Sequence, residues 1–236
     1  MENFLENIGL IDYDQDDVIN LLESEANNHN VIKLEDYRDL ELLQIRIDEY
    51  AGIGFLADHD DCIHELGIMC SSKAENEVTP IKWFDVETDE QYFRMLNIET
   101  NGDLDALPLN VFVPYRELVM EQEIMMNLYA FVIEAHIYES EEALSQNSKM
   151  AAESLIPSGT FGVDESFEPN CEFIMNTHIL EIQKHFNRFT NCEYYVLKVN
   201  CLGLEFDVVA AIDDFEVEPK VNDIISGLFF AQGNFE

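Results

Sequence analysis

The chain has 236 residues, 47% of them hydrophobic, and its 49 acidic and 12 basic side chains give a net charge of −37. The hydrophobic content excludes an acidic disordered tail and suffices for one large domain or two smaller ones. The charge disfavours binding to nucleic acid or anionic lipid and favours a basic partner, although a solubilising surface is the simpler explanation. The negative charge runs along the whole chain: residues 1–100 carry −19, residues 101–170 carry −11 and residues 171–236 carry −7.

The cysteines and the N-terminus indicate a reducing compartment. The five cysteines form no CxxC pair and leave one over, and they are Cys62, Cys70, Cys171, Cys192 and Cys201. No signal peptide follows Met1, and no apolar run reaches the roughly 18 residues of a membrane span. We therefore expect a cytoplasmic protein with small buried thiols and no membrane contact.

The first 30 residues predict two short helices. Phe4, Leu5 and Ile8 share a face of the first helix, which Gly9 is placed to end. Asp14 or Asp16 can cap the second helix. Its predicted apolar face consists of Val18, Leu21, Leu22 and Ala26.

From Leu40 the hydrophobic period changes to two, which predicts strands. Leu43, Ile45 and Ile47 alternate with polar residues, and the segment 50–55 is expected to continue or pair with this strand through a bulge at its glycines. Further strands are predicted at 63–69, 81–86 and 109–113. The apolar run 123–138 could be helix or strand, and its β-branched and aromatic content favours a strand, after which a short helix is predicted to open at 139–142. Residues 145–170 lose periodicity and are the best candidate domain boundary.

The C-terminal residues alternate most clearly. Strands are predicted at 171–182, 194–201, 204–210 and 224–230, with a linker of about ten residues before the last strand. Such a series suits a small, strongly coiled barrel of the oligonucleotide/oligosaccharide-binding (OB) shape, with a β-sandwich as the main alternative. We therefore predict an α+β fold: residues 1–165 form an N-terminal mixed α/β part with antiparallel strands, and residues 166–236 form a small OB-like antiparallel β-barrel.

Several short segments resemble uncharacterised bacterial proteins known only as domains of unknown function. The similarity covers about a third of the chain. It is weaker at two further places, Phe4-Leu5 together with Ile8-Gly9, and Tyr50-Ala51-Gly52. Its main segments are 156–159, Tyr194-Tyr195, 206–209, 218–221 and 225–230 with Gln232-Gly233. The resemblance implies an intracellular bacterial protein, supports the barrel and supplies no activity.

Two acidic segments contain metal-ligand residue types. Asp12, Asp14, Asp16 and Glu23 have the spacing of a calcium loop, but Asp17 stands where the turn requires glycine, and a helix starting near Asp16 would abolish the loop. In the second segment, zinc could use His59, Cys62 and His64, but no second ligand cluster follows. We predict no metal and no cofactor.

Residues 184–189, at the first turn of the predicted barrel, carry basic side chains in a chain that is otherwise strongly acidic. This segment combines bases with aromatic rings, and Tyr194 lies on the adjoining strand beside it. We predict that this tip binds a partner, with nucleic acid an unfavoured ligand. The partner-binding residues are Lys184, His185, Phe186, Arg188, Phe189 and Tyr194.

The sequence carries no nucleophile elbow, phosphate-binding glycine loop or His-Glu-x-x-His motif. The leading hypothesis is a non-enzymatic protein-binding or adaptor module for a basic protein. A DNA mimic or immunity-type inhibitor of a nucleic-acid-binding protein is the first alternative. A metal-dependent enzyme that uses the acidic loops is the second.

Overall fold

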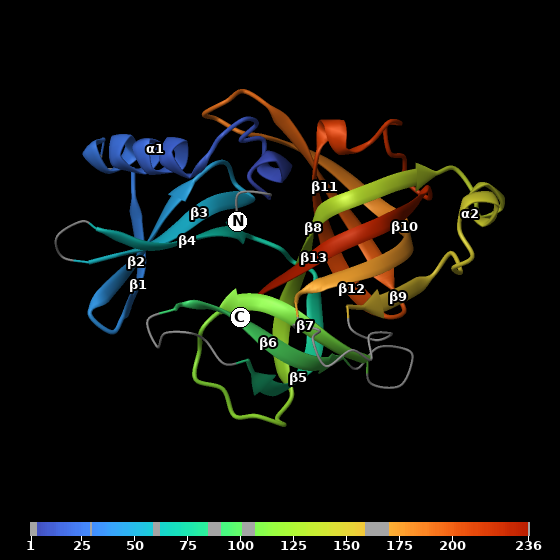
Figure 1. Cartoon of the computed structure of the whole chain (residues 1–236), viewed down its shortest axis with the longest axis horizontal. Coiled ribbons are helices and arrows are strands. Elements are labelled where there is room, and N and C mark those ends of the chain that lie inside the picture. Colours follow the sequence, from blue (N-terminus) through green and yellow to red (C-terminus); the bar gives the residue numbers. More distant parts are fainter. Residues whose placement is uncertain are drawn as a thin grey trace.

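The computed structural model describes residues 4–28, 30–58, 62–84, 91–100, 107–158 and 170–235. Of these described residues, 57% lie in strands and 12% in helices, and the strands form a four-stranded and a nine-stranded sheet. The predicted α+β fold is therefore wrong, because the N-terminal part is built mainly from strands and not from a mixture of helices and strands. Figure 1 shows the four-stranded sheet beside a group of long, curved strands from the second half of the chain.

The first sheet is antiparallel and follows chain order. Its strands are β1 (Ile32–Tyr37), β2 (Leu40–Arg46), β3 (Ala51–Ala57) and β4 (Ile63–Cys70). The predicted bulge at the glycines is wrong, because β2 and β3 pair in regular register from Glu41 to Arg46. A Cβ atom on Gly52 would lie 2.7 Å from the Ile45 carbonyl oxygen, so glycine lets these two strands approach closely.

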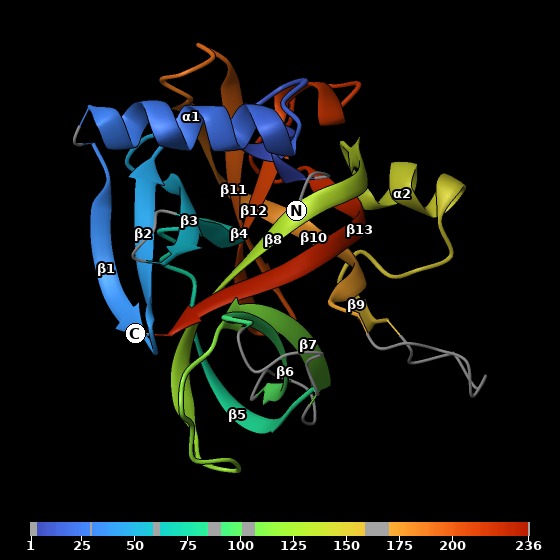
Figure 2. The same cartoon turned by 60° about the vertical axis from the view of Figure 1, so that its left-hand side comes forward.

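Two helical segments precede this sheet, as predicted. The 3₁₀ turn η2 (Glu6–Ile8) ends at Gly9, whose φ of 75° is left-handed. Helix α1 (Gln15–Asn27) begins at Asp14, whose side chain accepts from the Asp17 backbone N–H. Val18 and Leu22 are buried as predicted, but Ala26 is exposed and Glu25 is buried in its place. Figure 2 shows α1 lying across the ends of β1–β4.

The second sheet contains the other nine strands. The first four are β5 (Glu75–Trp83), β6 (Phe93–Thr100), β7 (Leu107–Pro114) and β8 (Ile124–Tyr138). The last five are β9 (Ser154–Pro157), β10 (Glu172–Phe186), β11 (Glu193–Cys201), β12 (Leu204–Ala211) and β13 (Ile224–Phe235). Helix α2 (Glu141–Asn147) follows β8, and the 3₁₀ turn η3 (Ile212–Asp214) follows β12. The strands β1, β6 and β9 were not predicted.

Five of these strands close a ring in the order β10–β11–β12–β8–β13 and back to β10. The predicted antiparallel barrel of residues 166–236 alone is wrong in two respects. The ring takes β8 from before residue 166, and β12 runs parallel to β8, with Asp207 opposite Tyr129. Alternation along a strand shows that it has two faces, but it does not show which strand pairs with it.

The ring has an apolar interior and a partly apolar outer face. Alternate residues of β11 such as Leu197 and Val199 point into the interior core, whereas Tyr194 and Val196 belong to a second core between the ring and the four-stranded sheet. This second core also includes Ile53 and Phe55 of β3. The two sheets therefore share a buried interface, and the polar residues at its margin form the candidate site.

Candidate functional site

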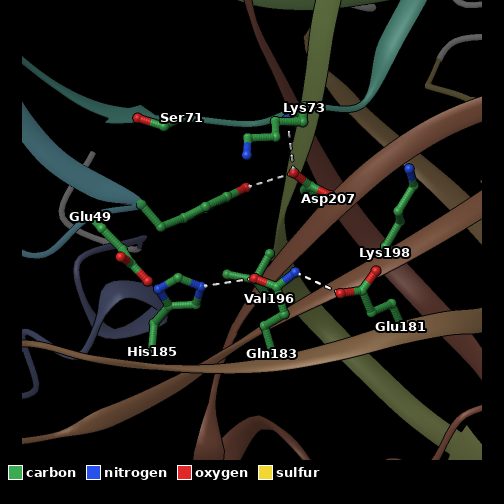
Figure 3. A pocket seen from close by; sticks show the side chains of 10 residues that line it. Glu49, Ser71, Lys73, Glu181, Gln183, His185, Val196, Lys198 and Asp207 are labelled. Carbon is green, nitrogen blue, oxygen red and sulfur yellow. Dashed lines mark hydrogen bonds between the residues drawn. The ribbon is translucent and has the colours of Figure 1, made fainter.

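A pocket of about 390 Å³ lies between the two sheets, and we call it the seam pocket (Figure 3). One wall comes from the turn before β3 and the segment after β4, and the other wall comes from the outer face of β10, β11 and β12. Its lining residues are Glu49, Tyr50, Ser71, Lys73, Glu181, Gln183, His185, Val196, Lys198 and Asp207. Most of these are polar, which is unusual for a position beside an apolar core.

The alternation of β10 and β11 places these side chains. Because Leu197 and Val199 fill the ring, Val196 and Lys198 must point outward. Glu181, Gln183 and His185 alternate in the same way along β10. The pocket therefore exists only because the first sheet covers part of this outer face.

His185 forms a polar contact between the sheets. It is 9% exposed, and its Nδ1 lies 3.3 Å from Oδ2 of Asp48 in the turn before β3. Its Nε2 lies 3.3 Å from Oε1 of Gln183, whose amide donates to Glu181 over 2.9 Å. Both ring nitrogens thus lie close to side-chain oxygen atoms, one from each wall of the seam pocket's interface.

Asp48 is held by four donors. Its Oδ1 accepts from the backbone N–H groups of Tyr50 and Ala51, both over 2.7 Å, and its Oδ2 accepts from the Tyr194 hydroxyl over 2.7 Å. Burial acts to raise the pKa of Asp48, but the hydrogen bonds from His185, Ala51, Tyr194 and Tyr50 outweigh it, so the pKa is lowered. Burial, followed by the bond to Asp48, raises the pKa of Tyr194. Asp48 is therefore an ionised, structural carboxylate.

Asp207 is the second buried carboxylate and lines the pocket directly. It is 8% exposed, and its Oδ2 accepts from the Tyr50 hydroxyl and from the Lys73 backbone N–H, each over 3.3 Å. Among the described residues, no basic side chain forms an ion pair with it. A buried carboxylate with two long hydrogen bonds and no ion pair retains capacity for a cationic ligand.

The seam pocket is lined by more carboxylates than ammonium groups. Lys198 is neutralised by Glu205, since their charged groups lie 3.0 Å apart. Lys73 extends along the pocket wall in Figure 3 and has no ion pair among the described residues. Glu49 and Glu181 line the pocket in addition to Asp207. The carboxylates therefore outnumber the ammonium groups, and Lys73 opposes a cation in this pocket.

The predicted partner-binding tip divides between two environments. His185 and Tyr194 turn into the interface between the sheets, and Phe189 packs against the same core. Lys184 pairs with Glu218 over 2.9 Å at the surface, and Phe186 is half exposed. Partner binding by these six residues stays a prediction, but five of them already make side-chain contacts within the chain, namely Lys184, His185, Arg188, Phe189 and Tyr194.

Arg188 shows what this tip does within the molecule. Its guanidinium lies 2.6 Å from the Glu25 carboxylate of α1, and its Nε donates to the Arg46 carbonyl over 2.8 Å. The neighbouring side chains of Asn187 and Thr190 donate to the carbonyls of Ile8 and Gly9. The turn between β10 and β11 therefore holds the N-terminal segment against the ring.

The two metal-ligand segments do not form clusters. Residues 15–23 are helical, so the calcium loop does not form. His64 pairs with Asp58 over 3.0 Å, Cys62 is exposed, and His59 lies outside the described residues. Among the side chains that the structure describes, no group of three His, Cys, Asp or Glu could hold a metal ion.

Sequence reasoning found only His185 among the lining residues of the seam pocket. Asp207 lies within the strand predicted at 204–210, and Asp48 follows the alternating segment that begins at Leu40; neither was predicted as a site residue. The sequence signal was an acidic residue placed between apolar ones on a strand, but 49 acidic residues make such positions common.

Comparison with known proteins yields no match: no family model, no curated protein and no solved structure resembles this chain. The resemblance to bacterial domains of unknown function therefore stays a prediction. Within the described part of the chain, no helix is both long and apolar enough to cross a membrane.

Proposed function

We propose that this protein is a non-enzymatic binding module for a basic protein, and that a lysine or arginine side chain of that partner enters the seam pocket. The observation that carries the proposal is Asp207, a buried carboxylate at the pocket wall without an ion pair among the described residues. A ligand cation would supply the missing charge partner.

The surroundings of Asp207 support this choice of ligand. The ring of Tyr50 lies 5.1 Å from the imidazole of His185 on the opposite wall, and aromatic faces attract cations and alkyl stems. The net charge of −37 would draw a basic partner toward this surface at low ionic strength. We also propose the cytoplasm as its location, which the absence of a disulfide among the five cysteines supports.

The test uses fragments that imitate the two basic side chains. We would titrate ¹⁵N-labelled protein with n-butylammonium and n-butylguanidinium, with 1-pentanol as the uncharged control. The proposal expects saturable shifts at the amides of Tyr50, Lys73, His185 and Asp207 with the cations and none with the alcohol. Shifts that are equal for all three compounds, or that are confined to other surfaces, would contradict the proposal.

Three variants sharpen the result. Asp207→Asn removes the charge but keeps an oxygen that can accept from Tyr50 and Lys73, so it should abolish cation binding without unfolding the protein. Lys73→Met removes the opposing ammonium and should strengthen binding. Asp213→Asn makes the same chemical change at an exposed site outside the pocket, and it should leave binding unchanged.

A further inference from the structure

The end of β13 approaches β1 and β2 in Figure 2. A second hollow region, away from the seam pocket, is lined by residues of these three strands among others. It consists of two adjoining cavities of about 370 Å³ each, which share Arg116 and Phe235. The first cavity is lined by Leu34 and Tyr115 among others, and the second by Val119 and Met125. We call the pair the apolar double groove.

The double groove exposes large apolar side chains. Val119 is 69% exposed, and Leu34 and Met125 are each 41% exposed. Single exposed apolar residues are ordinary, but a contiguous patch beside a hollow is typical of a binding surface. Arg116 and Phe235 line both cavities, so the two hollows lie side by side.

Acidic side chains surround this patch. Glu35 lines the first cavity and Glu117 lines the second, while Glu77 is exposed and lies directly opposite Met125 in the β5–β8 pairing. Glu121 and Glu123 are exposed on either side of Gln122, which also lines the second cavity. Among the described lining residues, Arg116 is the one basic side chain.

This charge distribution decides between the possible occupants. A second copy of the chain would bring another net charge of −37 against an acidic rim, and like charges repel. A segment that carries apolar side chains next to lysine or arginine would fill the groove and neutralise the rim. We infer that the apolar double groove docks such a segment of a basic partner, an inference that rests on the proposed function for the nature of the partner.

The experiment uses two synthetic eight-residue peptides. One alternates leucine and lysine, and the other has serine in place of each leucine. With ¹⁵N-labelled protein, the leucine peptide should shift the amides of Leu34, Val119, Met125 and Phe235, and the serine peptide should not. Equal shifts with both peptides, or leucine-dependent shifts elsewhere, would overturn the inference, as would a dimer in sedimentation that buries the groove.

Variants separate this inference from the seam pocket. The double variant V119D/M125D changes two exposed positions and should weaken binding of the leucine peptide at least tenfold. Val217→Asp, at another half-exposed position outside the groove, should leave it unchanged. Asp207→Asn should abolish fragment binding in the seam pocket but leave the groove shifts intact. The two proposals can therefore fail independently.

Discussion

Oδ2 of Asp48 and Nδ1 of His185 lie 3.3 Å apart and join the turn before β3 of one sheet to β10 of the other. Tyr194 on β11 donates to the same carboxylate oxygen, so three elements meet at one buried group. Because a polar group in such a place must be satisfied, this cluster can favour one relative placement of the two sheets.

The first prediction concerns this carboxylate. Asp48→Asn should lower the free energy of unfolding by about 2–4 kcal/mol at pH 7, because the donors would face a neutral amide. The pKa of Asp48 is lowered in the folded state, so its stabilisation is present above the unfolded value of 3.8 and is lost as the pH falls through the folded value. Urea unfolding of both proteins from pH 7 to pH 2 should therefore show a difference that persists down to about pH 4 and shrinks below it. A difference independent of pH would contradict this role, and Glu193→Gln, at an exposed site, is the control.

The second prediction concerns the contact between the β10–β11 turn and α1. Arg188→Met should destabilise the protein by about 1–3 kcal/mol, because it leaves the buried carboxylate of Glu25 without its ion pair. Adding Glu25→Gln should recover part of that loss, which a double-mutant cycle of urea unfolding measures. Lys184→Met removes an exposed ion pair with Glu218 and should have no measurable effect. Strictly additive losses from Arg188→Met and Glu25→Gln would show that this ion pair does not stabilise the fold.

The third prediction concerns Asp214 in η3. Burial raises its pKa to about 6, against hydrogen bonds from the Ala211 N–H and the Asn7 side chain. A raised carboxyl pKa means that the folded state binds the proton more tightly, so this group favours folding at low pH and loses that contribution as the pH rises from about 4 to about 6. Asp214→Asn cannot ionise, so relative to the wild type it should gain about 1–2 kcal/mol over that range, after allowance for solvent screening. Thermal unfolding midpoints at pH 4.5, 5.5 and 6.5 check this, and a constant offset between the two proteins would refute it.

The fourth prediction concerns Gly227 on β13, opposite Ala135 of β8. A Cβ atom at this position would lie 2.1 Å from the Glu134 carbonyl oxygen and 2.7 Å from the Ala135 Cα. Since these are backbone atoms of the ring, Gly227→Ala should destabilise the protein by about 2–4 kcal/mol in urea unfolding. Ser226→Ala on the same strand is the control and should have a small effect. Unchanged stability of Gly227→Ala would show that β8 and β13 can separate here at little cost.

Much of the local structure could be predicted from the residues. The strand at 124–138 follows from its β-branched and aromatic content, and the end of the first helical turn follows from Gly9. β1 was missed because a strand with charged residues and little burial lacks the apolar alternation that sequence reading requires. Glu25 shows the same limit on a helix, because its burial depends on Arg188, which lies far away in the sequence.

By itself, the sequence determined the strong negative charge, the apolar content for a large core, the alternation of β11 and β12, and the β-branched and aromatic content of β8. Only the tertiary structure decided that β8 closes the ring with strands from after residue 166, and that the first sheet covers the outer face of β11 and β12. Alternation is a local property of one strand, whereas pairing and coverage depend on contacts between residues far apart in the chain. The seam pocket belongs to this second kind of information, because Asp207 and Tyr50 meet there across 157 residues of sequence.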